Sequence, residues 1–156
     1  MKRENYISWD DLYMGIAKLT SKRSKDPRTQ NGACIIDSKM RIVSIGYNGL
    51  PDGCSDDEFS WEREEKHKYV IHAEINAILN AKVDLSDCIM YIYSERGYYP
   101  CSNGCAQAII QKGIKEVVLD YVSCSVDIKD KYKGEATKQM FNASGVKIRI
   151  LNNGEK

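Results

Sequence analysis

The stretch CIMYIYSERGYYPCSNGCAQAIIQKGIKEVVLDYVS, residues 88–123, decides the fold. Its two ends, residues 88–94 and 116–123, are rich in β-branched and aromatic residues, as strands are. Between them, residues 105–114 carry apolar side chains typical of a buried helix, and Gly113 stands where a left-handed residue ends a helix. A strand, a helix and a second strand in succession favour a sheet that is covered by helices.

Further elements flank this stretch on both sides. The additional predicted strands are residues 32–37, 41–48 and 146–151, and the short polar run SKM joins the first two as in a hairpin. The additional predicted helices are residues 8–24, 69–82 and 134–145. Residues 48–68 are rich in turn formers and charge, which indicates a long functional loop. The sequence therefore predicts an α/β fold, a three-layer α/β/α sandwich with a five-stranded mixed sheet.

Two of these helices carry apolar residues at helical spacing. In residues 8–24 the apolar positions at helical spacing are Trp9, Leu12, Tyr13, Ile16 and Leu19. In residues 69–82 they form two stripes, Ile71, Ile75, Ile78 and Leu79 on one side and Ala73, Ala77 and Ala81 on another. The spacing in residues 8–24 predicts a helix, and we expect the helix of residues 69–82 to be buried.

The length and composition fit one domain in a reducing compartment. With 156 residues, the chain can form one core without disulfide bonds, and we expect a single catalytic domain over residues 1–156. Its 23 basic and 22 acidic residues give a net charge of +1, which does not favour a nucleic acid partner. No apolar run resembles a signal peptide or reaches the roughly 18 residues of a membrane span. We therefore expect a cytoplasmic protein without membrane contact, whose six cysteines are thiols or metal ligands.

Four residues form a candidate metal site. His72 and Glu74 stand at the start of one buried helix, and Cys101 and Cys105 stand at the start of another. One histidine and two cysteines are a standard set for a catalytic zinc that keeps its fourth position for water. Glu74 lies about 200° around a helix from His72, so it is not expected to bind the same metal. It reaches the water on that metal if His72 precedes the regular helix, and a carboxylate there can take up and deliver a proton.

Each of these residues also has an interpretation without metal. A histidine at a helix start is often a cap or a core residue, two cysteines one turn apart are often buried thiols, and Glu74 suits the positive end of a helix dipole. A glutamate in a helix of Ala and Ile, together with a proline before Cys101, favours the metal site over these separate readings. H-x-E followed by P-C-x-x-C is the known signature of zinc deaminases, and here HAE matches while PCSNGC has one residue more.

On these residues the chain resembles the cytidine deaminase superfamily. The motifs that carry the resemblance are HAEINAI, PCSNGCA, RSKDPRTQNGACIID, GYNGLPDGCSDD and GIKEVV. The zinc motif is common to the superfamily, whereas RSKDP and GYNGLPDGCSDD are similar to deoxycytidylate (dCMP) deaminases. The resemblance implies a cytidine deaminase-like fold and hydrolytic deamination of dCMP to dUMP and ammonia, which supplies dUMP for dTTP synthesis. It implies that His72, Cys101 and Cys105 bind one zinc ion, and that Glu74 protonates N3 of cytosine and then the leaving amine.

The resemblance also implies a set of substrate-binding residues. Asn48 matches an asparagine that contacts the sugar, although from the residues alone it is equally a turn residue after a strand. Ala73, next to the histidine, is implied to contact the substrate as well. Arg23 and Lys25 are the expected phosphate contacts, because Arg can bind phosphate through two bonds and Lys as a point charge. Without the resemblance, a charge run of this kind is usually a solvated surface.

Assembly and regulation are likewise implied by the resemblance. It implies a homohexamer that dCTP activates and dTTP inhibits, with Gly46, Asn48 and Gly49 near the effector. Mg²⁺ is expected only together with a triphosphate effector. A second, structural zinc ion bound in part by Cys54 and His67 is an alternative use of the loop.

Two features depart from the family pattern. Ser102, Asn103 and Gly104 separate the paired cysteines where the family has two residues, and SERGYY lengthens the approach to Pro100. Spacings of three and four positions both keep two thiols on one helix face, about 60° or 40° apart. Both ligands are therefore retained, and the expected change is in the pocket wall above the base. The competing functions are a deaminase of another cytosine or adenine substrate, such as a free nucleoside or a tRNA adenosine, and a non-catalytic zinc protein.

Overall fold

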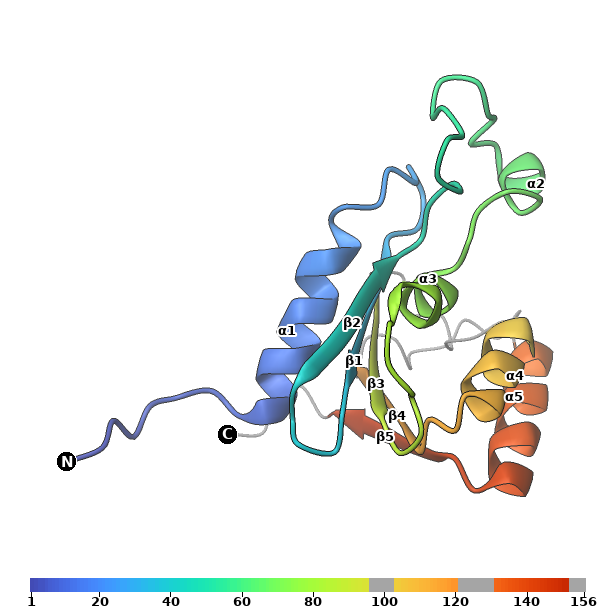
Figure 1. Cartoon of the computed structure of the whole chain (residues 1–156). Helices are drawn as coiled ribbons and strands as arrows, with labels where there is room; N and C mark the ends of the chain where they lie inside the picture. Colours follow the sequence, from blue (N-terminus) through green and yellow to red (C-terminus); the bar gives the residue numbers. More distant parts are fainter. Residues whose placement is uncertain (96–102, 121–130, 152–156) are drawn as a thin grey trace.

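A computed structural model of the chain describes residues 1–95, 103–120 and 131–151. The strands in these ranges are β1 (Asn31–Ile36), β2 (Ile42–Tyr47), β3 (Ile89–Ser94), β4 (Glu116–Asp120) and β5 (Lys147–Leu151). They form one sheet in the order β2-β1-β3-β4-β5, as Figure 1 shows. β1 is antiparallel to both β2 and β3, whereas β3, β4 and β5 are parallel to one another. The predicted five-stranded mixed sheet is thereby confirmed.

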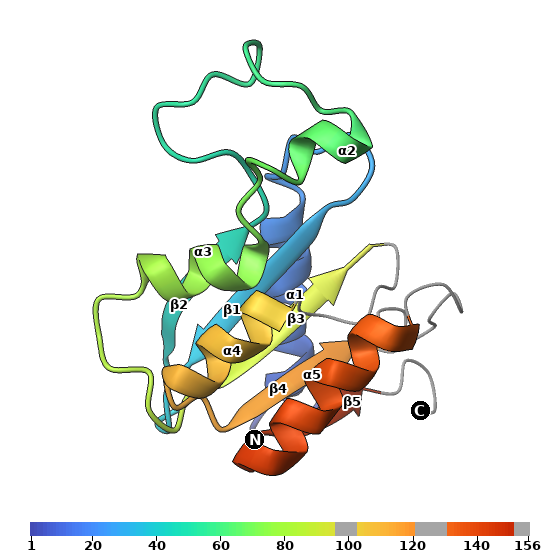
Figure 2. The same ribbon diagram turned by 90° about the vertical axis from the view of Figure 1, so that its right-hand side faces the viewer.

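Helices cover both faces of this sheet. The helices in the described ranges are α1 (Trp9–Ser21), α2 (Arg63–Lys66), α3 (Ala73–Asn80), α4 (Asn103–Gln111) and α5 (Lys131–Ser144). α1 lies on one face, and α3, α4 and α5 lie on the other (Figure 1, Figure 2). Each face of the sheet has its own hydrophobic core, and successive residues of β1 contribute to them in turn. Ala33 and Ile35 pack with the three helices, while Cys34 and Ile36 pack with α1. This arrangement is the predicted three-layer sandwich. In the described ranges, every helix is too short or too polar to cross a membrane.

Helix α1 packs on the sheet through a small side chain. Ala17 is fully buried against Gly32 of β1, where an added Cβ would lie 1.9 Å from the Ala17 carbonyl oxygen. This close approach turns Ala17 and the neighbouring Tyr13 toward the sheet. The predicted helix is present, and two of its apolar residues, Trp9 and Leu19, are 59% and 70% exposed.

Helix α3 packs on β2 in the same manner. A Cβ added to Gly46 would lie 2.3 Å from the Ala77 nitrogen and 2.5 Å from the Ala73 carbonyl oxygen. The two alanines are fully buried, and the rotation that places them on the strand turns Leu79 outward, where it is 67% exposed. The predicted alanine stripe is therefore the packed one in α3, and the expectation that Leu79 shares a buried face is wrong.

We expect Gly46→Ala to lower the free energy of unfolding by roughly 1–3 kcal/mol, because the new methyl group overlaps backbone atoms that cannot move independently of α3. Urea denaturation followed by circular dichroism measures the change. Gly15→Ala is the matched control, since Gly15 lies in α1 with nothing within 4 Å of an added Cβ. There alanine should be neutral or stabilising by up to about 1 kcal/mol. Equal stability of Gly46→Ala and the unmodified protein would contradict the close contact.

An ion-pair network ties the start of α1 to the far strands. Arg149 of β5 donates to the two carboxylate oxygens of Asp10 at 2.6 and 2.9 Å, and to Glu116 at 2.6 Å. The Tyr91 hydroxyl donates to Asp10 at 2.6 Å. The hydrogen bonds from Arg149 lower the pKa of Asp10 from its usual 3.8, against the raising effect of burial. The ionised form of Asp10 therefore stabilises the folded state.

Asp10→Asn is expected to reduce stability by about 1 kcal/mol at neutral pH, a modest amount because the pair is partly exposed to solvent. Since the folded-state pKa lies below 3.8, the contribution is complete above that value and is lost as the pH falls through the lower folded pKa. The difference between the two proteins should thus shrink below about pH 4, as denaturation at several pH values would measure. Glu135→Gln, at an exposed position of α5, is the control. A difference that is constant down to pH 2 would argue against this pair.

Candidate metal centre

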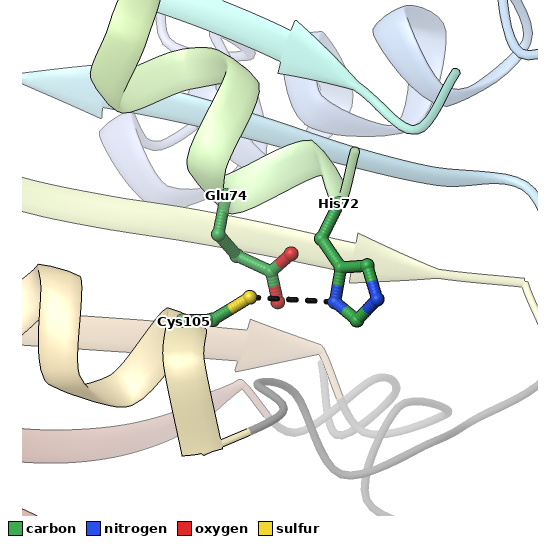
Figure 3. A group of neighbouring side chains, drawn as sticks. All are labelled: His72, Glu74 and Cys105. Carbon is green, nitrogen blue, oxygen red and sulfur yellow. Dashed lines mark hydrogen bonds between the residues drawn. The ribbon is translucent and has the colours of Figure 1, made fainter. Parts of the chain in front are cut away.

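His72 stands just outside α3. Its backbone has φ −69° and ψ 153°, the extended conformation of the residue that caps a helix. Ile71 before it pairs with Gly49 through backbone hydrogen bonds of 2.8 and 3.1 Å, so the helix predicted from residue 69 begins only at Ala73. Because His72 precedes the helical turn, its side chain and that of Glu74 converge on one point instead of lying on opposite sides (Figure 3).

Cys105 reaches the same point from α4. It is the third residue of that helix, and its Sγ lies 3.3 Å from Nδ1 of His72. Ligand atoms of His72, Glu74 and Cys105 all lie within 4.8 Å of one another. Glu74 and Cys105 are 4% and 1% exposed, whereas His72 is more accessible. Among the described residues, this is the one group of three side chains of metal-binding type.

The geometry of this group fits a zinc ion. Zinc binds cysteine sulfur at about 2.3 Å and histidine nitrogen at about 2.0–2.1 Å, so a tetrahedral angle separates the two donors by about 3.5 Å. The observed separation between Cys105 Sγ and His72 Nδ1 is 3.3 Å. A thiolate with an imidazole suits zinc better than magnesium or calcium, which prefer oxygen ligands. The predicted third ligand, Cys101, lies outside the described residues.

Side chains of α3 and β2 hold the helix that carries His72 and Glu74. Asn76 donates to the Tyr47 carbonyl at 2.7 Å, and Asn80, one turn later, donates to the Ile45 carbonyl at 3.3 Å. Ser44 of β2 donates to the Ala77 carbonyl at 2.6 Å. The two asparagines also cover carbonyls of a strand at the edge of the sheet, which would otherwise be free to pair with another strand. The sequence analysis missed these contacts, and the i, i+4 spacing of the asparagines was their available signal.

Asn48, the predicted sugar contact, is buried at the end of β2. Its Nδ2 donates to the Thr29 carbonyl at 2.9 Å, and its Oδ1 accepts from the Asn31 N–H at 2.9 Å. Its side chain thus joins two segments of backbone. Ala73, the second predicted substrate residue, is fully buried between His72 and Glu74, with its carbonyl against β2.

The predicted phosphate contacts lie at the surface beyond α1. The Arg23 guanidinium stands 6.0 Å from the centre of the Tyr47 ring. Lys25 forms an ion pair with Asp56 of the long loop, and its side chain remains 54% exposed. Both cations are thus exposed, and Lys25 already has an anionic partner. The structure places Arg23 over the residue that precedes Asn48.

A buried ion pair that the sequence analysis missed fixes the long loop. Lys66 Nζ donates to the two carboxylate oxygens of Asp26 at 2.8 and 2.6 Å, and both residues are buried. Asp26 also accepts from the backbone N–H groups of Arg28 and Thr29 at 2.9 and 3.1 Å. The pair therefore joins α2 to the segment before β1. Sequence offered little signal for it, because both residues stand among charges that resemble a solvated surface.

The predicted effector residues have structural explanations. Gly46 lies under α3, and Gly49 is the partner of Ile71 in the bridge before His72. Cys54 and His67 do not join a group of three metal-binding side chains in the described ranges. The loop thus shows no second metal centre among these residues.

Comparisons with known structures agree with this fold. The crystal structure of dCMP deaminase from the cyanophage S-TIM5 in complex with dCMP and dUMP superposes with a TM-score of 0.66 at 23% identity, covering 94% of this chain and all of that one. RibD of Acinetobacter baumannii superposes with a TM-score of 0.61 at 18% identity, covering 91% of this chain and 35% of that one. These similarities confirm the cytidine deaminase-like fold.

Comparisons of sequence extend to most of the chain. Human deoxycytidylate deaminase is 43% identical over 159 residues, which cover 95% of this chain and 82% of the human protein. A probable deoxycytidylate deaminase of Drosophila melanogaster is 46% identical over 160 residues, covering 95% of this chain and 74% of the fly protein. The profile of the cytidine and deoxycytidylate deaminase zinc-binding region matches residues 7–121, which include His72, Glu74 and Cys105. The chain therefore belongs to the family of zinc-binding cytidine and deoxycytidylate deaminases.

Proposed function

We propose that this chain is a zinc-dependent hydrolase that converts dCMP and water to dUMP and ammonia. The observation that carries the proposal is the buried carboxylate of Glu74 within 4.8 Å of the donor atoms of His72 and Cys105. Structural zinc sites are typically closed by four Cys or His ligands, whereas catalytic sites keep a position open. An acid at this place therefore favours catalysis over a structural role. The 43% identity to human deoxycytidylate deaminase supports dCMP as the substrate.

Different residues of the chain have separate roles in this reaction. His72 and Cys105, with Cys101 as the proposed third ligand, would hold the ion. When bound, zinc lowers the pKa of a water molecule to near 7 and so supplies a nucleophile for C4 of cytosine. Glu74 would take one proton from that water and deliver it to N3, where it remains in dUMP. It would then take the second proton from the oxygen now on C4 and deliver it to the departing amine. One C–O bond forms at C4 and one C–N bond breaks, and the near-complete burial of Glu74 keeps bulk water from the proton path.

The substrate contacts belong to the same proposal. Oδ1 of Asn48 accepts one hydrogen bond, from the Asn31 N–H, and can accept a second from a sugar hydroxyl. Ala73 forms the wall next to His72. Arg23 and Lys25 are exposed cations that a phosphate can reach, and Lys25 would exchange Asp56 for it.

Assembly and regulation are proposed from the family resemblance. We propose a cytoplasmic homohexamer that is activated by dCTP and inhibited by dTTP, with no nucleic acid or membrane partner. Gly46, Asn48 and Gly49 would lie near the effector, and Mg²⁺ would bind only with a triphosphate. Because Gly46 and Gly49 are buried in backbone contacts, we expect them to shape such a site through the path of the chain.

Glu74→Gln is expected to keep its zinc and to lose at least about 100-fold in kcat, because glutamine has the same shape but cannot take up a proton. Zinc content by atomic absorption and turnover of dCMP measure the two effects separately. Cys105→Ala should lose both zinc and activity, and Glu64→Gln, at an exposed position of α2, should lose neither. Activity within tenfold of the unmodified enzyme would remove Glu74 from the proton path.

A substrate panel tests the reaction itself. With dCMP, CMP, dCTP, deoxycytidine and a tRNA at equal concentration, kcat/KM should be highest for dCMP. Deoxycytidine, which lacks the phosphate, should fall by at least about tenfold, since a charge-assisted hydrogen bond contributes roughly 1.5–3 kcal/mol. Arg23→Ala should remove most of that difference. Equal turnover of deoxycytidine and dCMP would contradict the phosphate contact, and turnover of the tRNA alone would contradict the proposed reaction.

A further inference from the structure

The buried ion pair between Asp26 and Lys66 has no part in the reaction steps described above. Its two side chains are only 2% and 6% exposed, although both carry a full charge. Removing two charges from water costs about as much free energy as their attraction returns, and apolar side chains of similar size often stabilise a fold equally well. Stability alone is therefore a poor explanation of this pair, and its neighbours indicate another.

The carboxylate of Asp26 lies beside the side chain of Asn48. Its Oδ1 accepts from the backbone N–H groups of Arg28 and Thr29 as well as from Lys66 Nζ. Its Oδ2 accepts from Lys66 Nζ at 2.6 Å and faces Nδ2 of Asn48 at 3.5 Å. The amide of Asn48 thus lies next to a negative charge that a buried lysine balances.

The orientation of the Asn48 amide is determined by these neighbours. Its Nδ2 has two acceptors, the Thr29 carbonyl at 2.9 Å and the Asp26 carboxylate. Its Oδ1 accepts from the Asn31 N–H at 2.9 Å. Turning the amide over would place its oxygen against a carbonyl and a carboxylate, and its NH₂ group against an N–H. Oδ1 of Asn48, which can accept one more hydrogen bond, is therefore held in one position.

Hydrogen bonds to its backbone hold Asn48 to the same segment. Ser24 Oγ donates to the Asn48 carbonyl at 2.7 Å, and the Asn48 N–H donates to the Asn31 carbonyl at 3.4 Å. Residues 24–31 thus contact Asn48 through its side chain and through both groups of its backbone. Asn48 cannot move independently of the segment that contains Asp26.

Lys66 connects this segment to the chain that leads to the metal centre. It belongs to α2, which lies beyond the end of β2 in both views (Figure 1, Figure 2). The carbonyl of Lys66 accepts from the Val70 N–H at 2.9 Å, and the residue after Val70 pairs with Gly49. The same lysine therefore binds Asp26 through its side chain and stabilises, through its backbone, the turn before His72.

We propose that Asp26 and Lys66 are positioning residues for the substrate, which act through Asn48. Asp26 sets the orientation of the Asn48 amide, and Lys66 supplies the charge that a buried carboxylate requires. A contact made equally to the bound substrate and to the transition state changes KM and leaves kcat unaltered. The pair therefore governs the binding of dCMP, whereas the metal centre governs the rate of its conversion. This inference rests on the proposed deamination of dCMP and on the proposed contact of Asn48 with the substrate.

Removal of both charges at once tests the proposal. The double variant Asp26→Asn/Lys66→Met leaves neither charge unpaired, so it should fold and keep its zinc. Its KM for dCMP should rise at least about fivefold, the effect of losing one hydrogen bond, with kcat within about twofold of the unmodified enzyme. A merely structural pair would lower kcat in proportion to the unfolded fraction and leave KM unchanged. That result, or unaltered kinetics, would overturn the proposal.

The matched control removes a different ion pair between the same two segments. Arg28 and Glu62 form an exposed pair at 3.7 Å, which joins the residues around Asp26 to the start of α2. Because an exposed pair contributes little, Arg28→Gln/Glu62→Gln should keep both KM and kcat within about twofold. A rise in KM equal to that of the buried pair would show that any loosening of the two segments suffices, which contradicts the role of Asp26.

A second cycle determines whether the pair acts through Asn48. In an enzyme that carries Asn48→Ala, the same double substitution should change KM by less than about twofold, because the contact that it positions is already lost. A further rise of about fivefold would show an independent effect and would overturn the proposal.

Melting temperature and zinc content report whether these variants fold. If they do not, a crystal structure of the unmodified enzyme with dUMP decides the question. Oδ1 of Asn48 within hydrogen-bond distance of the nucleotide, with Nδ2 toward Asp26, supports the proposal, and any other arrangement overturns it. An unmodified enzyme without turnover of dCMP would instead refute the proposed function.

Discussion

The contact between Gly46 of β2 and the backbone of α3 sets the position of the metal centre. Because Gly46 has no side chain, Ala73 and Ala77 lie directly on the strand, closer than any other residue would permit. Ser44, Asn76 and Asn80 then fix the helix along the strand by hydrogen bonds. His72 and Glu74 thus project from a helix end whose distance and direction relative to the sheet are both fixed. A catalytic group acts only within a narrow range of positions, so this rigidity matters for the chemistry.

The sequence predicted the layers of the fold because these depend on local patterns. Strand-like runs alternate with apolar helical segments, and the structure contains the predicted strands with ends shifted by at most one residue within the described ranges. The rotations of α1 and α3 were not predictable in the same way. Helical periodicity is read mainly from large apolar residues such as Trp9 and Leu79, and both are exposed here. The faces that pack on the sheet instead contain Ala17 and Ala73, which lie against glycines of the strands. Such contacts join distant segments and leave no local pattern.

Three residues of the metal centre were also predictable from the sequence. His72, Glu74 and Cys105 belong to motifs that few other functions require together, and the structure brings them within 4.8 Å of one another. The start of α3 depends on the bridge between Gly49 and Ile71, a pairing between segments more than twenty residues apart, and so was placed too early. The Lys66–Asp26 pair escaped notice for a different reason, since buried and solvated charges look alike in a sequence. A buried pair is a poor source of stability, but loss of one partner leaves the other charge without compensation.

The order of the strands has a consequence for how the protein folds. β1 pairs with β3, which lies more than fifty residues away along the chain, and α3 and α4 stand on either side of β3 in sequence. Pairings of such long range form slowly, because a large loop must close before any contact is gained. His72 and Cys105 therefore become neighbours only after β3 has joined β1. An ion that binds both residues stabilises that joined state selectively, and the metal content of a preparation thus reports on whether the two halves of the sheet have come together.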